Sequence, residues 1–381
     1  MPLNRKYRYF YITKARKIIL KLGTKVLLSH DKDLEKDKIH RLVEDIVQFR
    51  SKGYEFYIVT SGAVGFGMTA LGVETRPTDL KKIQALASIG QGLLMQKWNE
   101  VFQSHGISVG QILLTYDVIE NRKRFLHARD CLNALEEYGT IPIINENDSV
   151  AVDELKFGDN DMLSAIASNL IEADLLILFT DTDGLFTKNP HKYPDATRIP
   201  LIEEVNDGIF SLIEDKHSHL STGGMQSKLK AAQMSATAGT GVVITDGFAP
   251  NLRAILEGQD VGTFVKPENT FVKEKKRWIF FNQKIKGKIF VDAGAENALM
   301  NHQRSLLPGG VVRTEENFDE GSIVGIYNDQ NEMIGKGIAF YSSEEIERIK
   351  GQRTDDIKKD MEGEKHFNEE IIHRDNMIIF R

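Results

Sequence analysis

The chain has 381 residues, with 49 lysines and arginines against 55 aspartates and glutamates, which gives a net charge of −6. This length exceeds what one hydrophobic core usually supports and therefore indicates two domains. The mixed charge argues against nucleic acid or an anionic membrane as the main partner, and no apolar run reaches the roughly 20 residues that span a bilayer.

Residues 1–16 form a basic, aromatic extension without an acidic side chain. The extension lacks the apolar centre of a secretory signal, so we expect a flexible or edge-packed tail. A transit peptide is the alternative, which the absence of serine weakens. The single cysteine, Cys131, excludes an internal disulfide and favours the reducing cytoplasm.

Residues 17–270 alternate short apolar runs with segments of helical period. This pattern predicts an α/β domain with a mainly parallel sheet sandwiched by helices. The predicted strands are residues 17–24, 54–62, 107–115, 140–148, 173–181 and 241–247. Each run ends in Gly, Thr or Asp, at the edge of the sheet where open α/β folds bind ligands.

Two of the segments between the strands are predicted to be helices. Residues 79–102 carry apolar side chains near helical spacing. These are Ile83, Leu86, Leu93, Leu94, Trp98 and Val101. Residues 127–139 are also typical of a helix, and we expect Cys131 to be a small core residue within it rather than a nucleophile.

From residue 286 the sequence pattern changes to short β-like runs separated by glycine. This change predicts a small, mostly β second domain at 286–365, followed by a tail at 366–381.

Two glycine-bearing strand ends are the first candidate sites. In "KLGT" (Lys21–Thr24) and "TSGAVGFG" (residues 60–67), glycines let a ligand approach the backbone, and Ser61 adds a hydroxyl. Either segment alone also fits a tight turn. Gly65, Gly67 and Ala70 form a GxGxxA pattern, which raises the alternative of a dinucleotide-binding enzyme. However, a helical segment lies where that fingerprint requires a second strand.

Two later segments offer groups that suit a nucleotide. "STGGMQSKLKAAQ" (residues 221–233) leads into a helix whose first turn carries Lys228, so free amides and an ammonium can hold phosphates, although the spacing is not that of a P-loop. An amphipathic helix with an exposed lysine is the alternative. Thr180, Asp181 and Asp183 follow the most apolar run and could line a nucleotide pocket or form an ordinary turn.

The segment "INENDSVAVDELKFGDNDMLSA" (residues 144–165) concentrates short oxygen and amide groups. Asp148 could pair with a substrate ammonium, Asn160 offers both a donor and an acceptor, and Asp161 could orient cationic side chains. A solvated loop with an aspartate that caps a helix is the alternative.

Taken in order, "KLGT", "VTSGA", "INENDSVA", "FGDNDMLSA", "LFTDTDGLFT" and "TGGMQSKLKAA" resemble the amino-acid kinase family, and within it the glutamate 5-kinases. "KRWI", "SLLPGGV" and "HRDNMI" resemble the carboxy-terminal PUA domain and tail of those enzymes. The resemblance implies ATP-dependent phosphorylation of the side-chain carboxylate of L-glutamate, at the start of proline biosynthesis. It also implies Mg²⁺ with ATP and proline as a feedback inhibitor, and we expect a homo-oligomer, either a dimer or a tetramer.

The resemblance assigns roles to residues. Lys21, Lys228 and Asp161 are implied to be catalytic, with Asp161 organising the two lysines. The implied glutamate-binding residues are Ser61, Asp148 and Asn160. The implied ATP-binding residues are Lys21, Thr180, Asp181, Thr222, Gly223, Gly224, Met225, Gln226, Ser227 and Lys228.

The chemistry of this transfer accounts for the residue types. A carboxylate is already ionised near neutral pH, so the nucleophile needs no general base. The reaction needs relief from repulsion between two anions, which lysines, exposed amides and Mg²⁺ supply. Phosphate oxygens and waters would hold the metal, so we expect no dedicated metal ligands in the chain.

Three other functions compete with this one. The first is a different amino-acid kinase, specific for aspartate or acetylglutamate. The second is an RNA-binding PUA protein, but residues 287–381 carry 12 Lys and Arg against 19 Asp and Glu, opposite to a basic footprint. The third is an amino-acid sensor without turnover, which the presence of both Lys21 and Lys228 disfavours.

Overall fold

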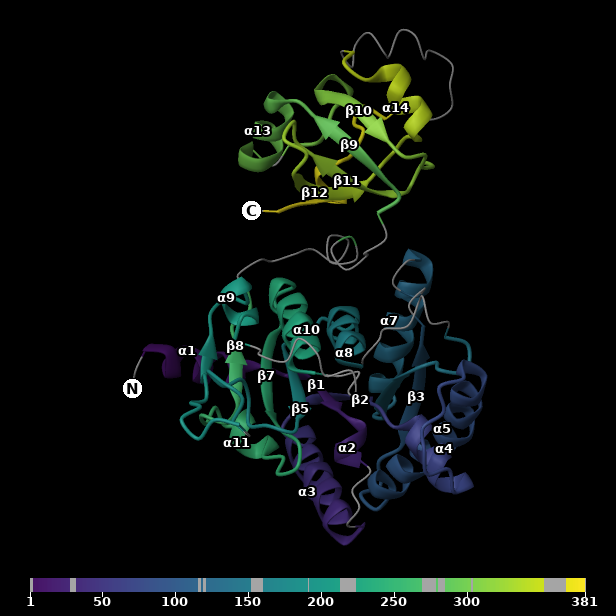
Figure 1. Ribbon diagram of the computed structural model, residues 1–381, viewed down its shortest axis with the longest axis vertical. Coiled ribbons are helices and arrows are strands. Elements are labelled where there is room, and N and C mark those ends of the chain that lie inside the picture. Colours follow the sequence, from purple (N-terminus) through teal and green to yellow (C-terminus); the bar gives the residue numbers. More distant parts are fainter. Residues whose placement is uncertain are drawn as a thin grey trace. The chain divides into compact units, whose positions relative to one another are not determined.

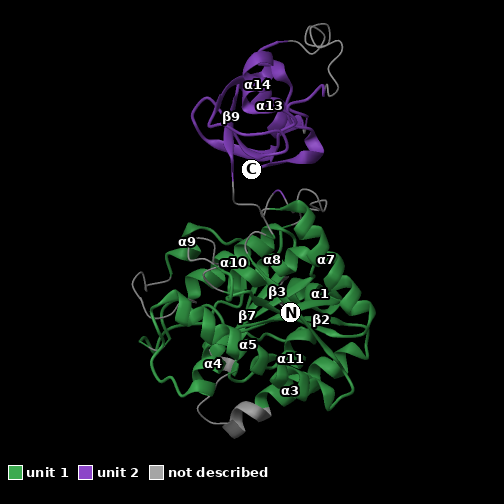
Figure 2. Ribbon diagram, turned by 90° about the vertical axis from the view of Figure 1, so that its right-hand side faces the viewer, with its two compact units in different colours: residues 1–271 green, residues 272–381 purple. Residues whose placement is uncertain are grey.

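The protein is described from a computed structural model. The described residues are 3–27, 32–115, 118, 121–151, 160–190, 192–212, 224–268, 279, 285–302, 304–352 and 368–380. The chain divides into two compact units, residues 1–271 and residues 272–381, which Figure 2 colours separately. Within the described ranges, no helix combines the length and apolarity needed to cross a membrane.

Unit 1 is built on an eight-stranded sheet with the order β3-β4-β2-β1-β5-β7-β8-β6. In chain order the strands are β1 (Lys17–Leu22), β2 (Glu55–Thr60), β3 (Val109–Leu114), β4 (Ile141–Glu146), β5 (Leu175–Thr180), β6 (Leu201–Ile202), β7 (Gly241–Asp246) and β8 (Thr263–Val265). The pairings between these strands are parallel except that of β7 with β8. The prediction of a mainly parallel sheet is confirmed.

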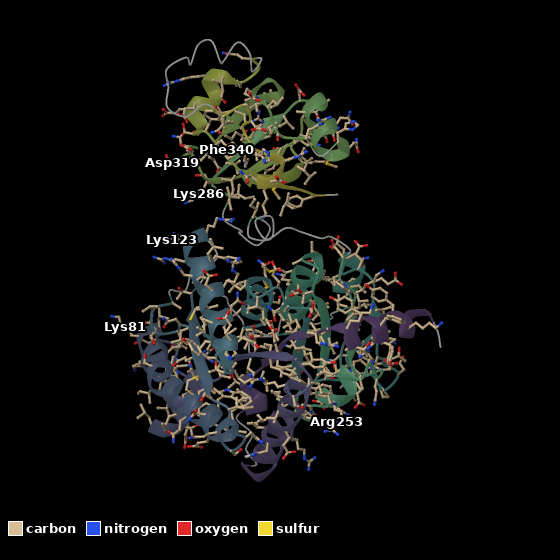
Figure 3. The ribbon with its side chains drawn as sticks, turned by 180° about the vertical axis from the view of Figure 1, so that it is seen from behind. Lys81, Lys123, Arg253, Lys286, Asp319 and Phe340 are labelled. Carbon is tan, nitrogen blue, oxygen red and sulfur yellow. The ribbon has the colours of Figure 1, made fainter. Side chains whose placement is uncertain are left out.

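Helices cover both faces of this sheet. In chain order the described helices of unit 1 are α1 (Leu3–Lys14), α2 (Thr24–Leu27), α3 (Lys32–Arg50), α4 (Ala63–Leu71), α5 (Leu80–Gln103), α7 (Arg122–Glu137), α8 (Asn160–Leu170), α9 (Asp207–Phe210), α10 (Met225–Thr237) and α11 (Leu252–Leu256). Figure 1 shows α8 and α10 on one face and α3 and α11 on the other. Charged side chains such as Lys81 on α5 and Arg253 on α11 lie at the surface (Figure 3).

The alternation along β1 explains how a lysine comes to be buried. Ile18, Leu20 and Leu22 point into the hydrophobic core beneath α3, and each such burial contributes about 1.5–3 kcal/mol. Because side chains alternate between the faces of a strand, Lys21 points to the opposite face, with α8. The alternation along β1 therefore places the Lys21 ammonium group beneath α8.

Helices α4 and α5 cross at very short range. A Cβ atom on Gly90 would lie 1.8 Å from the Ala63 carbonyl oxygen, and one on Gly67 would lie 2.0 Å from that of Leu86. These glycines are therefore required by helix packing. Gly65 and Gly67 lie inside α4 and not in a phosphate-binding turn, so the alternative of a dinucleotide fingerprint is wrong.

The amino-terminal extension packs against unit 1 as helix α1. The Arg8 side chain is 4% exposed, forms an ion pair with Asp260 at 3.3 Å and donates to the carbonyl groups of Val261 and Gly262. The Tyr11 hydroxyl donates to the Asp174 carbonyl at 2.9 Å. We expected this extension to be either flexible or packed at an edge, and residues 3–14 are packed at an edge.

One expectation about a buried side chain is wrong. Cys131 is exposed on α7, whereas its neighbour Leu132 is fully buried. On α5, Leu93 is 38% exposed while Leu94 is 1% exposed. Successive helical residues are rotated by roughly 100°, so a one-position error in the hydrophobic pattern moves a side chain from the core to solvent.

Unit 2 contains a five-stranded sheet with the order β10-β9-β11-β12-β13. Its elements are β9 (Gly287–Val291), α13 (Ala293–His302), η2 (Pro308–Gly310), β10 (Val311–Glu315), β11 (Ile323–Tyr327), β12 (Met333–Ile338), α14 (Ser343–Ile349), η3 (Arg374–Asn376) and β13 (Met377–Ile379). β9 pairs in parallel with β11, and the other pairs are antiparallel. The prediction of a small, mostly β second domain is confirmed.

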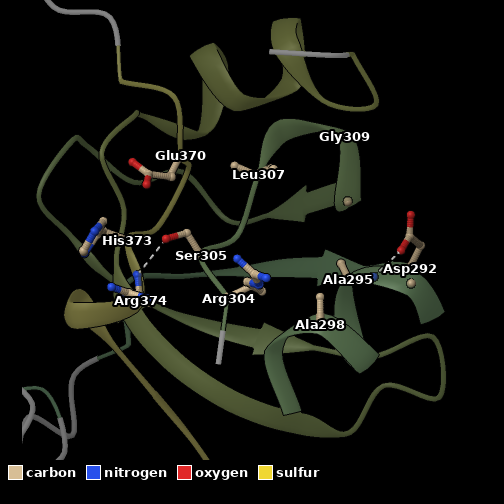
Figure 4. Close-up of a pocket in the computed structure, with 12 residues that line it drawn as sticks. Asp292, Ala295, Ala298, Arg304, Ser305, Leu307, Gly309, Glu370, His373 and Arg374 are labelled. Atoms are coloured by element: carbon tan, nitrogen blue, oxygen red, sulfur yellow. Dashed lines mark hydrogen bonds between the residues drawn. The ribbon is translucent and has the colours of Figure 1, made fainter. Parts of the chain in front are cut away.

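A pocket of about 860 Å³ lies in unit 2 beside α13 (Figure 4). Arg304 and Arg374 line it together with Asp292 and Glu370, so its wall carries both signs of charge. The Arg374 backbone N–H donates to the Ser305 hydroxyl at 3.1 Å and joins the two segments that form the wall. The pocket does not present the uniformly basic surface that a nucleic-acid backbone requires.

Candidate active site

Three charged side chains meet at the carboxyl end of β1. Lys21 is the penultimate residue of that strand, Asp161 lies in the first turn of α8, and Lys228 lies in the first turn of α10. The Lys21 ammonium forms an ion pair with Asp161 Oδ1 at 2.5 Å, and the Lys228 ammonium donates to Oδ2 at 3.0 Å. The carboxylate is thus shared between two cations.

All three side chains are buried, with exposures of 5% for Lys21, 6% for Lys228 and 0% for Asp161. Burying a charge is costly unless an opposite charge compensates it, so Asp161 makes the burial of two lysines tolerable. The cluster carries one net positive charge, because two ammonium groups share one carboxylate. It is therefore suited to receive an anion.

The start of α10 adds backbone donors to this cluster. Gly224 is the residue before the helix, and no side chain caps it. The amides of the first helical turn have no partner within the helix, so they can bind an anion, and the helix dipole favours negative charge there. The Ser227 hydroxyl lies 2.9 Å from both Asp161 Oδ2 and the Gly224 carbonyl oxygen and can donate its one hydrogen to either, which ties the turn to the carboxylate.

Next to Asp161 on α8, Asn160 organises a neutral part of the site. Its Nδ2 group carries two hydrogens and lies within hydrogen-bond distance of three acceptors, the Thr60 carbonyl at 2.5 Å, the Ser61 hydroxyl at 2.9 Å and Asn145 Oδ1 at 2.8 Å. These partners lie at or next to the carboxyl ends of β2 and β4, so one amide joins the ends of two strands. Because Asn160 and Asp161 are adjacent on α8, the neutral and charged parts of the site keep a fixed distance from each other.

Two further predicted residues lie at neighbouring strand ends. Thr180 is the last residue of β5, and its hydroxyl donates to Asp181 Oδ1 at 3.2 Å. Asp148 is half-buried in the turn that follows β4. These positions agree with the general rule that parallel sheets bind ligands at their carboxyl edge.

Comparisons with known proteins identify the family. A model of the amino acid kinase family matches residues 16–246, and a PUA domain model matches residues 287–361. The chain belongs to the amino acid kinase family. A glutamate 5-kinase from Caldanaerobacter subterraneus subsp. tengcongensis is 42% identical over 364 residues, which cover 95% of this chain and 97% of that protein.

A glutamate 5-kinase from Moorella thermoacetica is 41% identical over 369 residues and 97% of each chain. A solved UMP kinase from Ureaplasma parvum is 14% identical with a TM-score of 0.46 and covers 66% of this chain and 99% of that one.

In this amino acid kinase, the structure brings together Lys21, Asp161 and Lys228 in direct contact, and places Asn160 and Ser61 beside them. Thr180, Asp181 and Asp148 lie at strand ends of the same sheet, whereas Thr222 and Gly223 lie outside the described residues. Within the described ranges, no three His, Cys, Asp or Glu side chains converge as a metal site. The individual roles of these residues stay predictions.

Sequence reasoning assigned no role to Asn145, although it lies inside the quoted "INEND" segment. Its Oδ1 atom accepts from Asn160 and from the Glu146 backbone N–H at 2.9 Å, and its side chain is 2% exposed. Its place at the end of a fully buried strand was the available signal, since a buried amide there must have partners.

Proposed function

We propose that this kinase transfers the γ-phosphoryl group of ATP to the side-chain carboxylate of L-glutamate and forms L-glutamyl 5-phosphate, the entry step of proline biosynthesis. The observation that carries the proposal is the Lys21–Asp161–Lys228 cluster beside the neutral amide of Asn160. The identity of about 40% to glutamate 5-kinases along nearly the whole chain supports the same substrate.

The two lysines would act on the transferring phosphoryl group. Charge spreads over its oxygens in the transition state, and fixed ammonium groups stabilise that charge without having to reorganise. Asp161 holds both ammonium groups in place and accepts no proton in the reaction. The glutamate carboxylate is already ionised near neutral pH, so the site needs no general base.

Mg²⁺ would accompany ATP and neutralise charge between the phosphates. The described donor set fits an ion that is held by phosphate oxygens and water, because the buried carboxylate of Asp161 is engaged by two lysines. Thr180 and Asp181, at the carboxyl end of β5, are the two side chains proposed to face the nucleotide.

The amino-acid end of the site would be formed by Ser61, Asn160 and Asp148. Asp148 would pair with the α-ammonium group of glutamate, while the hydroxyl and amide groups would bind oxygen atoms. In the Asp148→Asn variant, we expect the glutamate KM to rise about 10-fold or more, because a hydrogen bond to a charged group contributes about 1.5–3 kcal/mol. The ATP KM should remain nearly unchanged, and equal rises in both constants would contradict the assignment.

The substrate is tested with an ATP-dependent hydroxamate assay on L-glutamate, L-aspartate, acetylglutamate and carbamate. We expect L-glutamate to have the highest kcat/KM. A preference for aspartate or acetylglutamate would assign the chain to another branch of the family.

Proline would inhibit by occupying the same pocket. It presents a ring ammonium beside a carboxylate, as glutamate does at its α-carbon, but has no side-chain carboxylate to phosphorylate. Linkage requires that each ligand weaken the binding of the other if they share contacts. An inhibition series at several glutamate concentrations tests this, and inhibition that saturating glutamate does not relieve would place the proline site elsewhere.

The proposed setting is a cytoplasmic enzyme that forms a homo-oligomer, either a dimer or a tetramer. Light scattering at several protein concentrations measures the mass directly, and a monomeric mass throughout would contradict this part of the proposal.

A further inference from the structure

Helix α5 carries a row of polar side chains on the face toward the turn that follows β4. Gln84, Ser88 and Gln91 are separated by four and three residues, so they lie on one face of the helix. We call them the α5 polar row. The helix otherwise buries large apolar groups such as Leu94 and Trp98, so this row stands apart from its core-packing residues.

Each member of the α5 polar row bonds to the segment 145–151. Gln84 Nε2 donates to the Ala151 carbonyl at 3.1 Å, and the hydroxyls of Ser88 and Ser149 are 2.9 Å apart. At the other end of the segment, Asn145 Nδ2 donates to Gln91 Oε1 at 2.8 Å. The row therefore holds the segment on both sides of Asp148.

The direction of the bond to Gln91 follows from the backbone. The Glu146 N–H can only donate, and it donates to Asn145 Oδ1, so that atom is the amide oxygen. The Asn145 nitrogen must then face Gln91, and the Gln91 atom that accepts from it must be its oxygen. Asn145 Oδ1 also accepts from Asn160, which gives a directed chain from Asn160 through Asn145 to Gln91.

This orientation has a cost at Gln91. With its oxygen committed to Asn145, the Nε2 group is buried and has no acceptor among the described residues. An unsatisfied buried donor is unfavourable, so nothing at Gln91 itself accounts for the arrangement. The benefit lies at Asn145, whose buried amide nitrogen donates to Gln91 and would otherwise lose this acceptor.

Helix α5 is a rigid support for this bond. The contact of Gly90 with the Ala63 carbonyl leaves no space for α5 to shift toward α4. The Trp98 indole N–H also reaches the Thr60 hydroxyl at 3.4 Å, at the strand end whose carbonyl accepts from Asn160. Gln91 thus extends from a helix whose position is set by close packing.

We infer that Gln91 is a positioning residue for the amino-acid substrate. It holds Asn145, and through Asn145 it holds Asn160, in the orientation that receives glutamate. Gln91 has no contact with the Lys21–Asp161–Lys228 cluster among its described hydrogen bonds, so its effect is specific to the amino-acid end of the site. The inference rests on the proposed glutamate kinase activity.

The test is Gln91→Met, which keeps the length of the side chain and removes the acceptor. Loss of the bond leaves the buried Asn145 donor unsatisfied, so we expect the glutamate KM to rise about 10-fold. The ATP KM and kcat should stay within about 2-fold, since the phosphate end is unchanged. Gln96→Met is the matched control, because Gln96 is exposed on the same helix and bonds only to Glu100 in the described structure.

Gln91→Asn provides a second variant if the methionine variant does not fold. It keeps the amide but is one methylene too short to reach Asn145, so the same selective rise in glutamate KM is expected. An unchanged glutamate KM, equal rises in both KM values, or the same change in Gln96→Met would overturn the inference. A wild-type protein that does not phosphorylate glutamate would instead refute the proposed function, so the two failures are distinguishable.

Discussion

The two units bury lysines in different ways. In unit 1, Lys21 and Lys228 are buried against one shared carboxylate, that of Asp161. In unit 2, Lys336 on β12 is 7% exposed, and desolvation lowers its pKa to about 8. The comparison teaches that desolvation makes a buried ammonium group hold its proton more weakly, and that a shared carboxylate offsets the cost of burying two such charges.

The largest effect is expected from removing the shared carboxylate. Asp161→Asn leaves two buried ammonium groups without it, so the free energy of unfolding should fall by about 3–5 kcal/mol. Turnover should fall by about 10³-fold, since both lysines lose their fixed positions. Chemical unfolding and initial rates at saturating substrates measure these two effects.

Asp195→Asn is the matched control for that variant. Asp195 also pairs with a lysine, Lys188 at 2.8 Å, but both side chains are exposed, so stability and turnover should change little. Near-normal turnover of Asp161→Asn would remove the carboxylate from the mechanism.

Removing one lysine should separate catalysis from stability. In Lys228→Ala, Asp161 keeps Lys21, so the loss of stability should be smaller than in Asp161→Asn. We expect kcat to fall about 10²–10³-fold, with a smaller change in glutamate KM, because the charge is most useful in the transition state. Lys230→Ala, an exposed lysine on the same helix, is the control, and equal losses in both variants would argue for a general effect on α10.

The buried lysine of unit 2 should make stability depend on pH. Between pH 8 and about 10.5, Lys336 is deprotonated in the folded state and protonated in the unfolded state, so folding releases a proton. Stability therefore rises with pH across this window, by up to about 3 kcal/mol, and the full penalty is present below pH 8.

Lys336→Met should remove this dependence and raise stability at pH 7. Hydrogen exchange of unit 2 amides measures the effect locally, with Lys230→Met as an exposed lysine control. Parallel pH curves for wild type and Lys336→Met would show that the lysine keeps its ordinary pKa.

The smallest effect is expected at a fourth buried cation, Arg8. Desolvation lowers its pKa to about 10 despite the opposing charge of Asp260, and it bonds to two carbonyl groups. Arg8→Met should cost about 1–3 kcal/mol through the loss of these bonds. Both KM values should stay unchanged, and a selective loss of activity would show that α1 supports the site as well as the fold.

The sheet of unit 1 was predictable because parallel strands are buried on both faces and appear as continuous apolar runs, such as residues 175–180. The polar ends of these runs also predicted where the site lies. Cys131 was misplaced because a helix pattern is sensitive to a shift of one residue, and the packing of Leu132 decides which side faces inward.

The geometry of the site was only partly predictable. Resemblance to a family indicated Lys21, Asp161 and Lys228, but the sharing of one carboxylate depends on three elements that are distant in sequence. Gln91 gave no local signal, because an amide on an amphipathic helix is ordinary until the end of β4 is placed beside it. Long-range contacts of this kind cannot be read from spacing along the chain.

The attachment of α1 has a consequence for how unit 1 assembles. Arg8 contacts residues that are 252 to 254 positions later in the chain. During synthesis α1 therefore leaves the ribosome early, but the partners of Arg8, which directly precede β8, are made only near the end of the unit. Its docking fastens the two ends of the unit's chain together, so it should form among the last contacts in folding and protect the completed unit from fraying at its start.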